Sequence, residues 1–178
     1  MAWRRGRKVL KIESRQGLDT MGQVGWVKQV IDTEKPTRVF IDVGGAGVAI
    51  YDRLVEMGYE ETVLRAINFG SEPLEPQPRD ESGKPRGGYR NRRAEMWGKS
   101  KEWLDDVGGA DIPDSDSLQA DACAPSYKYD SLTRVLLESK DDIRKRGMRS
   151  PFAEPVNPER MVVDTWQPVR TAGGWMAN

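Results

Sequence analysis

The chain has 178 residues, 37% of them hydrophobic and 31% charged, and no run approaches the roughly 20 apolar residues of a membrane span, so we expect one globular, cytoplasmic domain. Its 28 basic and 28 acidic residues give a net charge of zero, which neither demands nor excludes a nucleic-acid partner. The absence of histidine and the single cysteine exclude a Ser-His-Asp triad, a histidine-ligated zinc and an internal disulfide, so any metal would sit on oxygen ligands, as magnesium, manganese or calcium do.

The N-terminal elements follow from short patterns. Alternating apolar and polar residues predict a strand over residues 8–15. Thr20 and Gln23 match a capping box, and apolar residues at helical spacing follow, so we predict a helix over residues 21–32.

The next segment has the clearest pattern of the chain. A β-branched apolar run over residues 37–43 predicts a buried strand that delivers Asp42 to its carboxyl end. Glycines within residues 44–47 then allow a sharp turn into an amphipathic helix that ends at Gly58. A short strand over residues 62–67 completes a βαβ unit, which predicts parallel strands and a right-handed crossover.

Asp42 is the first candidate for a functional residue. Open α/β sheets bind ligands beyond the carboxyl ends of their strands, where this acid would lie. Two other interpretations stay open. Asp42 could cap the helix that follows, or the GGAG sequence could bind a phosphate, although Ile50 stands where a dinucleotide fingerprint has its third glycine.

The C-terminal half begins with a change of composition. Residues 71–90 contain four prolines and three glycines, which predict an exposed, mobile loop. The following stretch, residues 91–106, is predicted to be a helix whose packed stripe consists of Met96, Ser100, Trp103 and Val107.

Shorter elements are predicted beyond this helix. Asp114 or Ser115 can cap a short helix, and residues 127–137 are typical of a β-hairpin. Residues 140–146 predict a basic helix. Beyond Pro151 the periodicity is lost.

Basic residues gather at residues 4–8, 90–93 and 144–149, which favours a phosphate-facing surface, while solvated faces of a charged protein are the alternative. The candidate DNA-binding residues are Arg92, Arg93, Lys99, Arg144, Lys145 and Arg146.

Longer stretches of the sequence add a resemblance. These stretches read VFIDVGGAGVAIYDRLVEMGY, INFG, NRRAEMWGKSKEWL, IPDSDSLQADACAPSYKYDS and LLESKDDIRKRGMRSP. In unbroken order over residues 6–154 they resemble the nuclease domain of tailed-phage large terminases. The resemblance implies an α/β fold with a ribonuclease H-like mixed sheet flanked by helices. It also implies one terminase nuclease-like domain over residues 1–154, followed by an irregular tail over residues 155–178.

The resemblance further implies metal-dependent endonucleolytic cleavage of concatemeric double-stranded viral DNA during genome packaging, with Mg²⁺ or Mn²⁺. The implied partners are double-stranded DNA, the other terminase subunits and the portal, in the cytoplasm of a bacterial host. No G-x-x-x-x-G-K-[ST] motif is present, so the chain by itself is not expected to be a packaging motor.

The family site uses three acids on two metals, and Asp42 matches the second of them. The resemblance therefore implies that Asp42 is a catalytic residue and metal ligand. The first and third acids find no counterpart, which implies a fold truncated at the first strand and after residue 151. Glu138, Asp141 and Asp142 are possible substitutes as ligands. The alternative function is a catalytically dead remnant that binds only DNA or other terminase subunits.

Overall fold

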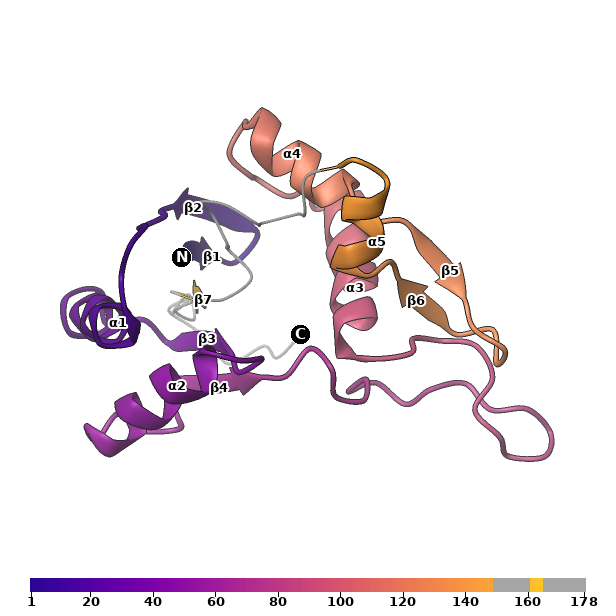
Figure 1. The fold of residues 1–178 in the computed structure, drawn as a ribbon, viewed down its shortest axis with the longest axis horizontal. Coiled ribbons are helices and arrows are strands. Elements are labelled where there is room, and N and C mark those ends of the chain that lie inside the picture. The colour runs from indigo at the N-terminus through magenta and orange to yellow at the C-terminus, as the bar shows by residue number, and fades with distance from the viewer. Residues whose placement is uncertain (149–160, 165–178) are drawn as a thin grey trace, which may run out of the picture.

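The computed structural model describes residues 1–148 and 161–164, which form a five-stranded sheet, a two-stranded hairpin and five helices (Figure 1). The strands are β1 (Ala2–Arg5), β2 (Lys8–Ile12), β3 (Arg38–Asp42), β4 (Leu64–Ile67), β5 (Tyr127–Tyr129), β6 (Val135–Leu137) and β7 (Met161–Asp164). The helices are α1 (Thr20–Glu34), α2 (Gly47–Glu56), α3 (Arg92–Asp105), α4 (Asp116–Cys123) and α5 (Lys140–Lys145).

The large sheet has the strand order β2-β1-β7-β3-β4 and mixes parallel and antiparallel pairs. β3 and β4 are parallel and joined through α2, which confirms the predicted βαβ unit. In Figure 1, α1 and α2 lie on one side of this sheet, and α3, α4, α5 and the β5–β6 hairpin lie on the other. The predicted mixed α/β sheet flanked by helices is therefore confirmed.

The middle strand comes from a part of the chain for which the sequence predicted an irregular tail. β7 pairs with β1 in parallel and with β3 in antiparallel orientation, so it joins the two outer strand pairs into one sheet. The strand is four residues long and only three of them are apolar, which is too short for a periodic signal. Its partner strands, β1 and β3, are more than one hundred residues away along the chain. Each of them has an edge with unpaired backbone groups, and pairing with these two edges makes the segment a strand.

Two details at the N-terminus differ from the prediction. β1 was not predicted, because its two arginines read as part of a charged surface cluster. The helix α1 is capped by Asp19, whose carboxylate accepts a hydrogen bond from the Gly22 amide at 2.7 Å, so the capping box at Thr20 and Gln23 is wrong. The predicted strand over residues 8–15 is confirmed in its first part, as β2.

The main core lies between the sheet and the helices α1 and α2. Val27, Val39, Leu54 and Leu64 are each 0% exposed within one cluster. Burying each of these side chains stabilises the fold by about 1.5–3 kcal/mol. Within the described residues, no helix is long and apolar enough to cross a membrane.

The second half of the molecule contains the predicted hairpin, β5–β6, and the predicted helices α3 to α5. The packed stripe predicted for α3 is wrong in part, because the helix buries Ala94 and Glu95 while Ser100 is exposed and Val107 lies beyond its end, fully exposed. Trp103 is half-buried. Arg7, in the turn after β1, lies 5.7 Å from the Trp103 ring centroid and donates to the Trp103 carbonyl at 2.5 Å, which joins the two halves.

Candidate functional site at the carboxyl end of β3

Asp42 is the last residue of β3, and its position follows from the alternation of the strand. Val39 and Ile41 are 0% and 1% exposed and belong to the core shared with α1 and α2. Arg38, Phe40 and Asp42 are half-buried and, because side chains alternate along a strand, share the opposite face. The Asp42 carboxylate therefore lies at the carboxyl end of the strand and outside the main apolar core.

The turn after β3 requires glycine at two positions. Gly45 has a φ of 86°, a left-handed conformation that side chains disfavour. A Cβ on Gly47 would lie 1.7 Å from the Asp42 carbonyl oxygen. The Gly44 amide donates to the Asp42 carboxylate at 2.8 Å, so the same turn orients the acid. The helix α2 has Ala46 as its N-cap and no side-chain cap hydrogen bond, so the interpretation of Asp42 as its cap is wrong.

A second oxygen-bearing side chain follows the neighbouring strand. Asp42 pairs in register with Ile67 of the parallel strand β4, which places Asn68 at the same edge of the sheet. The Asn68 carboxamide oxygen accepts a hydrogen bond from the Gly70 amide at 2.9 Å, in the same way that Asp42 accepts from Gly44. Sequence reasoning missed Asn68, although a polar residue directly after a parallel strand was a usable signal.

The donor set at this edge does not by itself fit a pair of metal ions. Among residues 1–148 and 161–164, no three carboxylate or thiol side chains gather into a group that could hold a metal. A two-metal site needs several such groups, so the role of Asp42 as metal ligand stays a prediction. The predicted substitutes Glu138, Asp141 and Asp142 instead bind basic side chains three or eight positions further along the chain.

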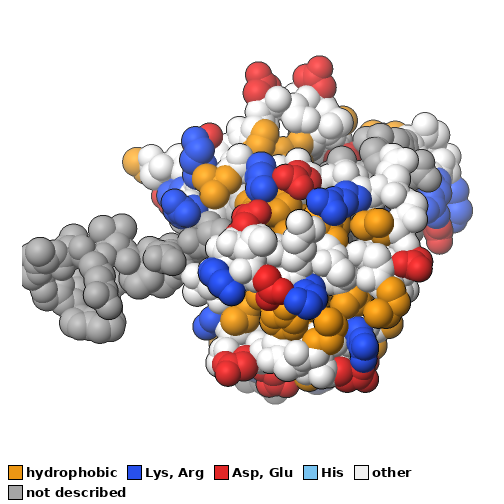
Figure 2. All heavy atoms as spheres, turned by 90° about the vertical axis from the view of Figure 1, so that its left-hand side faces the viewer, with side chains coloured by type: hydrophobic (Ala, Val, Ile, Leu, Met, Phe, Trp, Pro, Cys, Tyr) orange, Lys and Arg blue, Asp and Glu red, His pale blue; other side chains and the backbone are white. Residues whose placement is uncertain are grey.

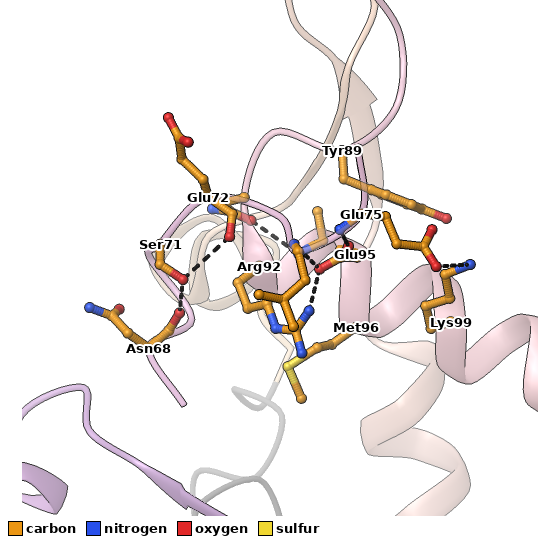
Figure 3. Close-up of polar contacts among 12 residues, drawn as sticks. Asn68, Ser71, Glu72, Glu75, Tyr89, Arg92, Glu95, Met96 and Lys99 are labelled. Atoms are coloured by element: carbon orange, nitrogen blue, oxygen red, sulfur yellow. Dashed lines mark hydrogen bonds and ion pairs between the residues drawn. The ribbon is translucent and has the colours of Figure 1, made fainter. Parts of the chain in front are cut away.

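Arg92, a predicted DNA contact, belongs to a network around the buried carboxylate of Glu95 (Figure 3). Glu95 is 1% exposed and accepts hydrogen bonds from the Leu74 amide at 3.0 Å, the Glu75 amide at 2.8 Å and the Arg92 guanidinium at 2.5 Å. Burial alone would raise the pKa of Glu95, but the amides of Glu75 and Leu74 and the charge of Arg92 hold that pKa below its ordinary value of 4.5. Arg92 therefore stabilises a buried acid.

Lys99 and Arg93 also have partners within the chain. Lys99 lies 3.0 Å from a carboxylate oxygen of both Glu102 and Glu75, and these hydrogen bonds, Glu102 first, raise the pKa of Lys99. The Arg93 guanidinium donates to the Glu138 carbonyl at 3.0 Å and so ties α3 to the end of β6. Each of these two side chains already contacts an acceptor within the chain. To bind a DNA phosphate, it would have to break that contact or bind both groups at once.

The three predicted cations of the last basic cluster differ in exposure. Arg146 donates to the Glu138 carboxylate at 2.7 and 2.5 Å and to the Ala124 carbonyl at 2.9 Å. The side chains of Arg144 and Lys145 are 60% and 77% exposed and pair with acids one turn earlier on α5. Exposed pairs of this kind contribute little to stability, so Arg144 and Lys145 are the most accessible of the six predicted cations.

On the face covered by α1 and α2, the described residues form no further basic surface. In Figure 2, which shows this face, blue and red side chains are interspersed and no large group of one sign is visible. This mixture agrees with the net charge of zero. A phosphate-facing surface is therefore to be sought on the side of α3 and the hairpin.

The chain is similar to the nuclease domain of the large terminase subunit gp2 of bacterial virus Sf6, with a TM-score of 0.64 and 14% sequence identity, over 83% of this chain and 74% of that chain. The chain has the fold of a large terminase nuclease domain. A mutant form of the Sf6 domain with manganese gives a TM-score of 0.65 at 14% identity, over 83% of this chain and 75% of the other. A mutant form with calcium gives a TM-score of 0.64.

Sequence comparison alone does not reach this result, since no protein-family model and no curated protein matches the chain. The terminase resemblance seen in the sequence is confirmed at the level of the fold, which is ribonuclease H-like. Two of these Sf6 structures contain manganese or calcium, which agrees with the expectation of a divalent metal for a terminase nuclease fold.

Proposed function

We propose that this domain is the nuclease domain of a phage large terminase and acts on concatemeric double-stranded DNA during genome packaging. The observation that supports the proposal is the terminase nuclease fold with an acid, Asp42, oriented by a glycine turn at the carboxyl end of β3. The proposed setting is the bacterial host cytoplasm, with the other terminase subunits and the portal as partners.

In this proposal Asp42 is one ligand of Mg²⁺ or Mn²⁺. A divalent metal would supply an activated water and stabilise the developing negative charge at the phosphate. The contribution of Asp42 itself is to present a fixed carboxylate, because the Gly44 amide orients one of its two oxygens. Cleavage needs further oxygen ligands beside this acid, since magnesium gives up its waters reluctantly.

A second function is favoured by the lone carboxylate at this edge. No group of three metal-binding side chains is present in the described part of the chain. A domain without cleavage activity would bind DNA or other terminase subunits through its surface. The two functions differ in one measurable property, which is metal-dependent strand cleavage.

Nicking of supercoiled plasmid with manganese tests the proposal. We expect the unchanged chain to nick and the Asp42→Ala variant to lose activity while remaining folded, because among the described residues the Asp42 side chain forms one hydrogen bond, to a turn amide. Asp52→Ala is the matched control, since Asp52 is an exposed acid on α2. If none of the folded proteins nicks, the binding function replaces the nuclease. If the Asp42→Ala variant nicks as well as the control, Asp42 is not the metal ligand.

A further inference from the structure

The segment predicted as a mobile loop contains a hydrogen-bonded finger, defined here as residues 78–86. The Asp80 amide donates to the Lys84 carbonyl at 2.9 Å, and the Arg86 amide donates to the Pro78 carbonyl at 2.8 Å. Arg79 and Pro85 form an antiparallel bridge. The finger is thus a narrow two-stranded ribbon, and Figure 1 shows the segment around it projecting beyond the tip of the β5–β6 hairpin.

The tip of the finger is closed by Asp80. Its carboxylate accepts hydrogen bonds from the Ser82 hydroxyl at 2.7 Å, the Ser82 amide at 2.9 Å and the Lys84 amide at 3.0 Å. The Ser82 hydroxyl, followed by the Lys84 amide, lowers the pKa of Asp80. The Asp80 carboxylate therefore binds the residues of the turn that follows it and stabilises the ribbon.

The base of the finger is attached on both sides. The Tyr89 amide donates to the Gln77 side-chain oxygen at 2.6 Å, and the Gly87 amide donates to the Leu132 carbonyl in the hairpin turn at 2.8 Å. Before the finger, the amides of Leu74 and Glu75 are held by Glu95 (Figure 3). A projecting segment with these attachments presents its side chains in a defined direction.

The finger carries cations that no acid in the described part of the chain neutralises. Arg79, Lys84 and Arg86 are exposed, and the Arg79 guanidinium donates to the Gly83 carbonyl at 2.6 Å. The side chains of Lys84 and Arg86 form no hydrogen bond or ion pair with another described residue. Glu81, also exposed, is the acid that opposes them. This contrasts with the six predicted DNA contacts, each of which has a partner within the chain.

We propose that the finger is a DNA-contacting element that enters the major groove of a duplex, with Lys84 and Arg86 binding the flanking phosphates. The inference rests on the proposed function for its partner, double-stranded DNA. A two-stranded ribbon fits the major groove, which is about 12 Å wide. Unpaired cations release counterions from the phosphates without first breaking an ion pair, so they contribute more to binding than the paired cations.

Binding of a fluorescent duplex to the full chain, measured with a chelator so that cleavage does not interfere, tests the finger. We expect Lys84→Gln with Arg86→Gln to reduce the slope of log affinity against log salt by about 1.8, because each phosphate contact contributes about 0.9. Lys28→Gln with Arg53→Gln removes the same charge from exposed but paired residues on α1 and α2, and should leave the slope nearly unchanged. Glu81→Gln should strengthen binding, since it removes the opposing acid.

Equal losses in the finger and control variants would show a general charge effect and overturn the assignment, as would full retention of binding by the finger variant. If the finger variant lost affinity for single-stranded DNA and not for the duplex, the proposed groove contact would be overturned. Failure of the unchanged chain to bind duplex would contradict the proposed function itself, whereas the other outcomes concern the finger alone.

Discussion

The sheet half of the molecule and the half formed by α3, α4, α5 and the hairpin are stabilised differently. The first buries a cluster of large apolar side chains, among them Trp3, Val27 and Leu54. The second has small or isolated apolar residues at its buried positions, such as Ala94 and Ile143, together with the buried acid Glu95. The apolar core is insensitive to the protonation of carboxylates, whereas the second half depends on charged side chains. Substitutions in the two halves should therefore respond differently to pH.

The largest effect is expected where backbone approaches backbone. Gly47→Ala would place a Cβ 1.7 Å from the Asp42 carbonyl oxygen, so β3 or α2 must move. We expect a loss of roughly 3 kcal/mol or more in the free energy of unfolding, at the upper end for single substitutions. Gly25→Ala in α1 is the control. It meets no atom within 4 Å, so the variant should be stabler by about 0.8–1.0 kcal/mol. Thermal unfolding measures both, and equal midpoints would contradict the geometry of the turn.

The next effect tests the apolar core. Leu54→Ala removes a side chain that is 0% exposed and should cost about 2–5 kcal/mol in the free energy of unfolding, through lost burial and a residual cavity. Because no titrating group is involved, the cost should be the same at neutral and at acid pH. Denaturant unfolding at both pH values checks this, and a strongly pH-dependent cost would contradict the separation of the two halves.

A smaller, pH-dependent effect is expected at Glu95. Glu95→Gln keeps the shape but removes the charge that accepts from Arg92 and two amides, which should cost about 1–3 kcal/mol at neutral pH. The folded pKa of Glu95 lies below its ordinary value of 4.5, so its contribution is fully present above that value and is lost as pH falls through the folded pKa.

Hydrogen exchange provides the measurement for Glu95. We expect faster exchange of the α3 amides in the Gln variant at neutral pH, with the α1 amides unchanged, and a smaller difference between variant and unchanged chain in acid. Equal acceleration in both helices would show that the two halves unfold as one unit.

Much of the fold was predictable because its signals are local. The strand ending at Asp42, the glycine turn and α2 occupy one continuous segment, and each shows its own periodicity. The β5–β6 hairpin and the Ser115 cap of α4 are likewise set by neighbouring residues. The position of Asp42 at the sheet edge followed from the sequence for the same reason. Asn68 was missed because only the register of β3 with β4 brings it to that edge.

The sequence by itself determined the βαβ unit, the hairpin and the acid at the end of β3, since hydrophobic period and turn chemistry act over a few residues. Only the tertiary structure decided the direction and place of β7, because it forms by pairing with β1 and β3, which are distant in the sequence. The tertiary structure also decided which cations are neutralised. Arg92 and Arg146 are paired, and Lys84 and Arg86 are unpaired within the described residues, because ion pairs depend on which side chains the folded chain brings within hydrogen-bonding distance.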